Sequence, residues 1–324
     1  MMSGYTYTND YPRSFSMFLP ASVFISRLRQ RPMIMIDICT ISHLKDRVSI
    51  YHGTDLRKKE RVRQLASMAE SGKYQFSFLT AIMEKGTDYR NRLSADEMVK
   101  AFQDDYDLIK DFIGKENFYE TREALAGVIP HLVDDRYSIE ERAELSIPAS
   151  LKLIGYFNTL GIVSTPSRAD RFKLAQQVVS EGERLGLGKG YPTITLCVAS
   201  IYGCIDARDI LKIRKDGKEK DGREFNPSNR LGDIMSLYRV ARARHMIHSL
   251  LPFVPVIFRT EDAGLENLHQ YLHTRVTGES EDNGTLMHST CTAPDRLFPA
   301  LYKQGKCIDE RELKRLYALL AFKD

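Results

Sequence analysis

Cysteine is scarce in this chain of 324 residues, which holds only five, an odd and scattered set. Because the cysteines show no CxxC pairs and cannot all pair with one another, they exclude a disulfide framework and paired zinc knuckles. A reducing cytoplasm is the compartment that fits this usage best. The five are Cys39, Cys197, Cys204, Cys291 and Cys307.

Long apolar runs are also missing. No uninterrupted run approaches the roughly 18 residues that a membrane-spanning helix needs. The apolar patch at residues 15–25 contains Pro20, follows Asp10 and lacks a small-residue cleavage pattern, so we do not expect a signal peptide. We therefore expect a cytoplasmic protein that is neither exported nor inserted in a membrane.

Several common catalytic motifs are absent. There is no GxSxG elbow, and no GxGxxG sequence follows a predicted strand, which leaves serine-hydrolase and dinucleotide-dependent oxidoreductase functions without support. The run GLGKGYP at residues 186–192 lacks the spacing and the Lys-Ser/Thr pair of a phosphate-binding loop. We expect it to be a turn that ends a helix.

The length allows one large domain or two ordinary ones, with enough apolar residues to bury a core. Lys and Arg number 47 against 43 Asp and Glu, so the net charge is 47 − 43 = +4. This mild excess permits an anionic partner without demanding one.

The stretch that organises the chain is residues 31–46. Met33 to Asp37 form a short apolar run that ends on a carboxylate, and a helical pattern resumes with Ile41 and Leu44. A run of this length is typical of a buried strand. Asp37 would then lie at the carboxyl end of a central strand, where open α/β sheets place ligands and catalytic groups. Its alternative role is to cap the helix that follows.

Periodicity and capping residues predict a largely helical chain with a second buried strand at residues 256–258. Ser77 is the candidate cap of an apolar helix that carries Glu84 near its end, and Asp233 lies in the first turn of a helix that begins near Arg230. The predicted helices are 55–71, 78–86, 94–113, 119–129, 138–160, 168–186, 191–212, 230–250, 263–273 and 309–322, with loops at 216–229 and 278–299.

Four carboxylates occupy comparable positions on these elements: Asp37, Glu84, Asp233 and Asp262. Strand ends and helix starts meet at one edge of an α/β sheet, so we expect the four to share a site, although 262 − 37 = 225 residues separate the outer pair. Each has an ordinary alternative as well, such as a first-turn acid for Asp233 or one half of a helix ion pair for Glu84.

A fold that gathers four carboxylates must offset their mutual repulsion, usually with hard divalent cations that prefer oxygen ligands. Mg²⁺ or Mn²⁺ is the natural occupant. Such ions activate water and stabilise the attacking and leaving oxygens of a phosphodiester. The four carboxylates therefore predict a metal site for hydrolysis of nucleic acid.

Four segments resemble the motifs of the PIN-domain nucleases, in the order and local context of that family. IMIDICTISHLKD (34–46) resembles the opening strand, FSFLTAIME (76–84) the second motif, NRLGDIMSLYRVARA (229–243) the third and VIFRTEDAGLENL (256–268) the fourth. The last is the most specific, because a strand followed by Thr-x-Asp, a small residue, Gly and Leu is how these domains usually close their site.

The resemblance implies a nuclease, most often a ribonuclease, with a PIN-like central parallel sheet flanked by helices. It also implies four acids that hold Mg²⁺ or Mn²⁺ and two hydroxyls that support the metal or an attacking water: Asp37, Glu84, Asp233 and Asp262, and Thr40 and Thr260.

The chain departs from the family in length. Its second and third acids lie 233 − 84 = 149 residues apart, much farther than in a compact PIN domain. We therefore expect an N-terminal arm at 1–30, a PIN-like domain at 31–275 interrupted by a helical insertion subdomain at about 94–190, and a C-terminal loop and helix at 276–324.

Basic residues downstream of Asp233 suggest a surface that contacts RNA phosphates, although an ordinary solvated helix face fits them as well. These are Arg239, Arg242 and Arg244. The loop cations Lys215, Lys218, Lys220 and Arg223 could contribute in the same way. His269 and His273 have metal-binding spacing on a helix but lack the Glu of a zincin motif, so packing or surface roles fit them better.

The sequence favours an α/β, metal-dependent ribonuclease, with a toxin or phage-defence role and an antitoxin or defence-protein partner by family analogy. The alternatives are a catalytically inactive PIN-like binding or scaffold protein and a flap-type DNA nuclease. Cleavage of RNA that is lost in Asp37→Asn would distinguish the ribonuclease from an inactive scaffold protein. A preference for RNA over branched DNA would distinguish it from a flap-type nuclease.

Overall fold

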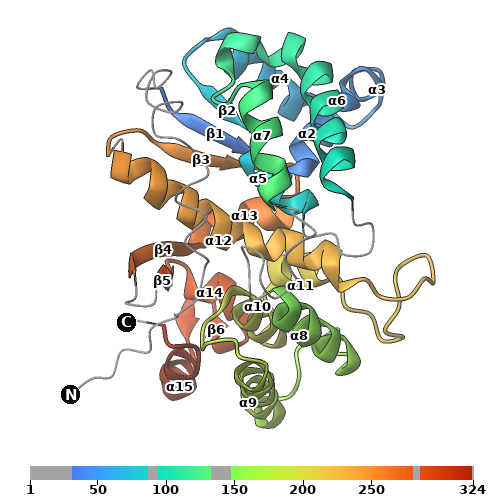
Figure 1. Cartoon of the computed structure of the whole chain (residues 1–324). Coiled ribbons are helices and arrows are strands. Elements are labelled where there is room, and N and C mark those ends of the chain that lie inside the picture. Colours follow the sequence, from blue (N-terminus) through green and yellow to red (C-terminus); the bar gives the residue numbers. More distant parts are fainter. Residues whose placement is uncertain (1–30, 87–92, 133–146, 251, 280–284, 323–324) are drawn as a thin grey trace. The chain divides into compact units, whose positions relative to one another are not determined.

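The computed structural model describes residues 31–86, 93–132, 147–250, 252–279 and 285–322 (Figure 1). The chain divides into two compact units. Among the described residues, the sheet unit holds those between 31 and 132 and between 242 and 262, and the helical unit holds those between 147 and 241 and between 263 and 322. The predicted arm at 1–30 lies outside the described residues.

A parallel sheet of three strands organises the sheet unit, with β1 (Met33–Ile36) between β2 (Gln75–Ser77) and β3 (Val256–Arg259) (Figure 1). Met33 lies opposite both Gln75 and Val256 in the register. All four residues of β1 are buried. A parallel strand that is covered on both faces needs a continuous apolar sequence, which explains why β1 was predictable from MIMI alone.

The two faces of β1 contribute to two different cores. Ile34 and Ile36 belong to the larger core, which also contains residues from α2, α4, α5, α6 and α7. Met33 and Met35 belong to a smaller core with Ala243 of α12 and its neighbours. Alternate residues of a strand point to opposite faces, so one apolar run serves both cores.

In the sequence, the helices of the sheet unit lie partly between β1 and β2 and partly after β2. They are α2 (Ile38–Lys45), α3 (Arg47–His52), α4 (Leu56–Glu70), α5 (Leu79–Lys85), α6 (Ala95–Ile113), η2 (Lys115–Asn117) and α7 (Arg122–Leu132). Ser94 and Glu97 form a complete capping box at the start of α6, and the predictions of α4 and α6 are confirmed to within two residues.

The helical unit is built from longer helices and two small antiparallel pairs of strands. Its elements are α8 (Ile147–Thr159), α9 (Arg168–Arg184), α10 (Pro192–Ile201), α11 (Ile205–Leu211), α13 (Ala263–Tyr271), β4 (Leu272–Glu279), β5 (Thr285–Cys291), α14 (Pro294–Leu297), η4 (Pro299–Leu301), β6 (Tyr302–Lys303), β7 (Lys306–Cys307) and α15 (Glu310–Leu320). The helix α12 (Pro227–Leu250) contributes residues to both units.

Several predicted boundaries are wrong. The helix predicted after Ser77 is confirmed as α5, but the residues before it form strand β2, which was not predicted. The predicted helix 191–212 is two helices that meet at Gly203, whose φ of 91° favours glycine. The predicted loop 278–299 contains part of the β4–β5 hairpin. The strands were missed because they form by pairing with other strands, which a local pattern does not show.

The helical insertion expected at 94–190 does not form one separate body. The helices α6 and α7 pack in the same core as β1 and β2, whereas α8 and α9 belong to the helical unit. Apolar positions such as Phe102, Tyr106 and Ile109 on α6 account for this placement, since they are buried against the sheet core.

The protein is thus a mixed α/β chain, mostly helical, with a small parallel sheet. None of the helices in the described ranges has the length and apolar character required to cross a membrane.

Candidate active site at the carboxyl edge of the sheet

Asp37 directly follows the central strand β1 and caps α2. Its Oδ1 accepts a hydrogen bond of 2.7 Å from the backbone N–H of Thr40, and its backbone is extended, as is usual for a helix cap. Its residue exposure is only 3%. The strand-end position and the cap, which the sequence left as alternatives, are both present in one residue.

Burial raises the pKa of Asp37 from 3.8 to about 6. Hydrogen bonds from the Thr260 hydroxyl and from the Thr40 N–H lower this pKa, and the nearby carboxylate of Glu261 raises it. Desolvation penalises the charged form, so a cation bound beside Asp37 would offset a penalty that the protein now carries.

Glu84 reaches the same end of α2. Its Oε2 accepts a hydrogen bond of 3.2 Å from the backbone N–H of Ile38, the residue after Asp37. The helix α5 is tied to the end of β1 because the Thr80 hydroxyl donates to the Ile36 carbonyl at 2.7 Å. Two of the predicted acids therefore bind backbone N–H groups within one helical turn.

The two predicted supporting hydroxyls hold Asp37 and its neighbouring strand end. The Thr260 hydroxyl bonds to the Asp37 carboxylate and accepts from the backbone N–H of Asp262 at 3.0 Å. The Thr40 hydroxyl donates to the Arg259 carbonyl at 3.2 Å. Both threonines are buried, whereas Asp262 is half-buried just after β3.

Between Thr260 and Asp262, the Glu261 carboxylate is enclosed by cations. Arg61 Nε lies 2.6 Å from its Oε2, Arg259 Nε lies 2.9 Å from its Oε1, and the side chain is 1% exposed. Arg61 also donates to the Thr260 carbonyl. Glu261 therefore fixes α4 to the end of β3, a role that the sequence motif alone did not indicate.

Asp105 of α6 positions the two helices that carry the site. Lys45 Nζ at the end of α2 and Lys85 Nζ at the end of α5 each lie 2.7 Å from its carboxylate. Asp105 is buried, and two cations compensate its charge. Since Lys85 follows Glu84, these ion pairs restrict the positions that the Glu84 carboxylate can take.

Sequence reasoning missed a further acid at the sheet edge, Glu120. Phe118 forms a parallel bridge with Phe76, which extends the sheet beyond β2, and Glu120 follows two residues later. The Ser77 hydroxyl donates to Glu120 Oε1. Burial raises the pKa of Glu120 to about 7. The only sequence signal was the short apolar pair before it, which is too brief to predict a strand.

Asp233 belongs to the other unit, as does Arg239, so the structure does not gather all four predicted acids in one unit. Asp233 is half-buried in the second turn of α12, not in a first turn, because α12 begins at Pro227. The Asn226 side chain accepts from the Ser228 N–H at 3.1 Å before this start. Pro at the first helical position is a standard start signal, which the prediction overlooked.

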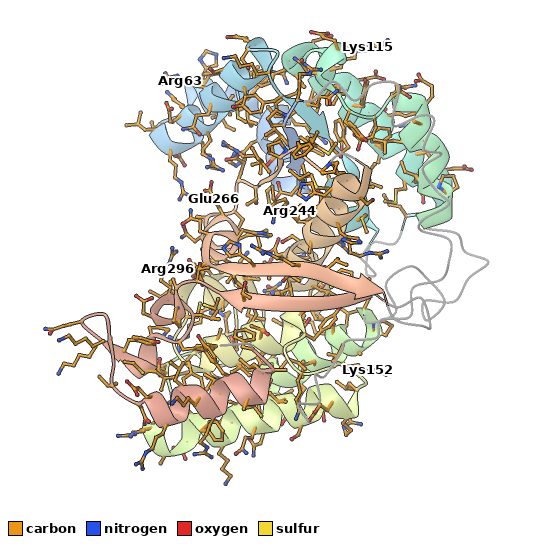
Figure 2. All side chains as sticks on the ribbon, turned by 90° about the vertical axis from the view of Figure 1, so that its left-hand side faces the viewer. Arg63, Lys115, Lys152, Arg244, Glu266 and Arg296 are labelled. Carbon is orange, nitrogen blue, oxygen red and sulfur yellow. The ribbon has the colours of Figure 1, made fainter. Side chains whose placement is uncertain are left out.

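The predicted RNA-contacting arginines differ in exposure. Arg239 is buried at 3% exposure, in contrast to the exposed face that we expected. Arg242 and Arg244 are half-buried in the sheet unit, and Arg244 Nε donates to the Val256 carbonyl at 3.1 Å (Figure 2). Their contact with RNA stays a prediction.

The predicted loop 216–229 is anchored to α12 through Glu219. Arg230 Nη1 and Nη2 bind the two carboxylate oxygens of Glu219 at 2.8 and 2.7 Å. The loop cations remain exposed around this anchor: Lys215, Lys218, Lys220 and Arg223.

The predicted histidine pair does not share a helix. The helix α13 ends at Tyr271, so His273 lies on β4, while His269 Nε2 hydrogen-bonds the Ser236 hydroxyl at 2.9 Å. This agrees with the packing role that the sequence favoured for His269.

Oxygen ligands for a hard cation are thus present at the edge of the sheet unit, chiefly Asp37 and Glu84. In the part of the chain that the structure describes, no group of three or more His, Cys, Asp or Glu side chains is already arranged to hold a metal ion. Comparisons of the chain with protein-family models, with curated proteins and with solved structures gave no match.

Proposed function

We propose that the protein is a metal-dependent ribonuclease with a PIN-like sheet, and that the edge around Asp37 is its active site. One observation carries the proposal. A buried carboxylate ends the central strand of a parallel sheet, and a second carboxylate, Glu84, binds the adjacent N–H of the same helix end. Catalytic groups of α/β proteins gather at this edge.

The donor chemistry suits a hard divalent cation. Asp37 is desolvated and its pKa is raised to about 6, so its charged form gains from a bound cation. Asp37 and Glu84 would hold Mg²⁺ or Mn²⁺, with Asp262 of the same unit as a further predicted ligand. Such an ion supplies an activated water and stabilises charge on the oxygens of the phosphodiester.

The surrounding residues of the chain would keep these carboxylates in place. Thr260 donates a hydrogen bond to Asp37, and Asp105 fixes the helix ends beside Asp37 and Glu84 through Lys45 and Lys85. A site whose supporting groups are fixed in advance does not need to reorganise when substrate binds.

The test compares cleavage of end-labelled single-stranded RNA in Mn²⁺, in Mg²⁺ and in EDTA. We expect cleavage that EDTA removes, and a loss of more than about 100-fold in Asp37→Asn, because losing a direct metal ligand should cost at least as much as losing a residue that only orients a ligand. Asp309→Asn is the matched control, since Asp309 caps α15 in the helical unit as Asp37 caps α2. It should cleave at the wild-type rate.

Cleavage that persists both in EDTA and in Asp37→Asn would contradict the metal mechanism. A wild-type protein that cleaves neither RNA nor DNA in either metal would support a binding or scaffold role instead. Preference for branched DNA over RNA would support a flap-type nuclease. A toxin or phage-defence role with a controlling partner stays a prediction of the family resemblance.

A further inference from the structure

One short segment of the sheet unit carries a strong local excess of positive charge. Residues 47–63, which cover α3 and the first half of α4, hold six Lys and Arg against two Asp and Glu, a net charge of 6 − 2 = +4. The whole chain of 324 residues also has a net charge of +4. The other 307 residues are therefore balanced, and this segment accounts for the excess.

Three cations at the start of α4 have no carboxylate partner among the described residues: Arg57, Lys58 and Lys59. Arg57 and Lys58 are exposed and Lys59 is half-buried. One turn further, the exposed Arg63 makes only a 3.9 Å contact with Glu60 (Figure 2). We name these four cations the basic end of α4.

Helix stability does not explain this placement. The first turn of a helix favours acidic side chains, because the macrodipole is positive there, and each cation at that end is mildly unfavourable. The cap is already complete, since Asp55 accepts from the Lys58 N–H at 3.0 Å. The cations therefore stand at a position where they repel one another and interact unfavourably with the helix dipole.

Exposed apolar side chains lie next to these cations in the chain. Tyr51 is 40% exposed on α3, and Leu56 is 78% exposed at the first position of α4. Three residues separate the two helices. An aromatic ring beside unpaired cations is the combination that binds single-stranded nucleic acid, where bases stack on the ring and cations follow the phosphates.

The basic end of α4 is anchored to the candidate active site. One turn into the helix, Arg61 binds Glu261 at 2.6 Å and donates to the Thr260 carbonyl. The Thr260 hydroxyl in turn bonds to Asp37. A single nucleic-acid strand bound along the start of α4 would therefore lie close to the carboxyl edge of the sheet.

We propose that the basic end of α4, with Tyr51, binds the phosphate backbone of single-stranded RNA and leads it to the edge that holds Asp37. The binding surface itself follows from charge and exposure, and only its role as a substrate surface rests on the proposed ribonuclease function. Contacts of this kind read the backbone without selecting a sequence.

The test is fluorescence anisotropy with a labelled single-stranded RNA of mixed sequence, in EDTA so that no cleavage occurs, over a range of salt concentrations. The variant replaces three cations by an uncharged residue of similar length: Arg57→Gln, Lys58→Gln and Lys59→Gln. The matched control removes three exposed lysines from helices of the helical unit: Lys152→Gln, Lys173→Gln and Lys314→Gln.

For single-stranded nucleic acid, each lost phosphate contact lowers the log–log salt slope by about 0.7. The variant should therefore lose about 2 from the slope, which corresponds to about 50-fold weaker binding near 0.15 M salt. The control should stay within about twofold of wild type. Tyr51→Leu, which keeps an apolar side chain, should weaken binding about fivefold through lost stacking.

Equal losses in the variant and the control would overturn the proposal, as would an unchanged salt slope in the variant. Two alternative ligands are measured separately: vesicles that contain phosphatidylserine, and a labelled DNA duplex. If the basic end of α4 is needed for either of these but not for single-stranded RNA, the proposal is wrong. Single-stranded DNA of the same sequence tests whether the ribose contributes.

Folding is checked by the melting temperature, which should be equal or slightly higher in the triple variant because first-turn cations are removed. If the triple variant fails to fold, Lys58→Gln and Arg63→Gln are measured singly, and each should lower the salt slope by about 0.7. Asp37→Asn should bind RNA normally while losing cleavage, so failure of the nuclease proposal and failure of the surface proposal give different results.

Discussion

Glu120 is a buried acid that forms no ion pair with a cation in the described part of the chain, and its substitution tests how the sheet edge is stabilised. Its Oε1 accepts from the Ser77 hydroxyl and its Oε2 from the Phe78 N–H at 3.4 Å. These hydrogen bonds lower its pKa, but burial outweighs them and raises the pKa from 4.5 to about 7. Glu120→Gln keeps the shape and removes the charge.

The direction of the pH effect follows from the proton balance. Below pH 4.5 the carboxyl group is protonated in both states, so it adds no pH dependence. Between 4.5 and about 7 the folded state holds the proton more tightly, and the free energy of unfolding falls as the pH rises. Above about 7 the cost is complete at about 3 kcal/mol, because each pKa unit corresponds to about 1.4 kcal/mol.

Urea unfolding followed by far-UV circular dichroism, at pH 4.5 and at pH 8, measures this cost. Relative to wild type, Glu120→Gln should be more stable at pH 8 than at pH 4.5 by up to about 3 kcal/mol, whatever the substitution costs at both pH values. Comparing two pH values removes the part of the effect that comes from altered hydrogen bonds.

The matched control is Glu97→Gln in the capping box of α6. Hydrogen bonds from Ser94 lower the pKa of Glu97, so its stabilisation is present above the ordinary pKa of 4.5 and is lost as the pH falls through the lower folded value. This control should lose stability at pH 8, the opposite sign. A Glu120→Gln variant with the same pH dependence as wild type would refute the assignment of Glu120 as a largely protonated, buried acid below pH 7.

Three further outcomes follow from packing, ion pairing and metal binding. Gly182→Ala in α9 should destabilise the protein by about 1–3 kcal/mol despite the better helix propensity of Ala, because the new Cβ would lie 2.5 Å from Ile194 Cδ1. Urea unfolding of the double variant with Ile194→Val should show a smaller loss of stability than the sum of the two single losses. Arg171→Leu should cost about 3–5 kcal/mol, because it leaves buried Glu312 without the cation that binds it at 2.7 and 2.8 Å, as measured by urea unfolding. Mn²⁺ at 100 times its dissociation constant should add about 2.7 kcal/mol to wild-type stability, seen as a higher melting temperature that chelation reverses, and should add little to Asp37→Asn.

The elements that the sequence predicted well are those whose signals are local. The helix α6 begins at a capping box formed by Ser94 and Glu97, and α4 begins after Asp55, whose side chain caps it. The strand β1 is a continuous apolar run because helices cover both faces of the sheet. Each of these patterns can be read without knowing the rest of the fold.

The strands that the sequence did not predict depend on the strands with which they pair. The three residues of β2 form a strand because β1 lies beside them, and they are too few to predict a strand from the sequence alone. The strand β4 follows α13 without a break because it pairs with β5. Pairing across the sheet overrides local preference in both places.

The candidate site was predictable in part. Asp37, Glu84, Thr260 and Asp262 belong to the same unit, and the strand-end and helix-end positions that suggested them are present. Glu120 was not predictable, because its position depends on a single bridge between Phe118 and Phe76. Cations that fix the edge, such as Arg61, also have no local signature.

The cap role and the proposed ligand role of Asp37 do not compete. An ionised carboxylate has two oxygens and about four lone-pair positions, and the cap needs one hydrogen bond, from the Thr40 N–H to Oδ1. The cap in fact makes the carboxylate a better ligand, because it fixes the side chain at the end of β1 before any cation arrives. Burial prevents water from stabilising the remaining charge, which is why the pKa stays raised to about 6 despite the hydrogen bonds from Thr260 and Thr40. A residue needed only as a cap gains nothing from this burial, since exposed Asp55 caps α4 in the same way. The difference between these two caps is therefore the physical reason to assign chemistry to Asp37.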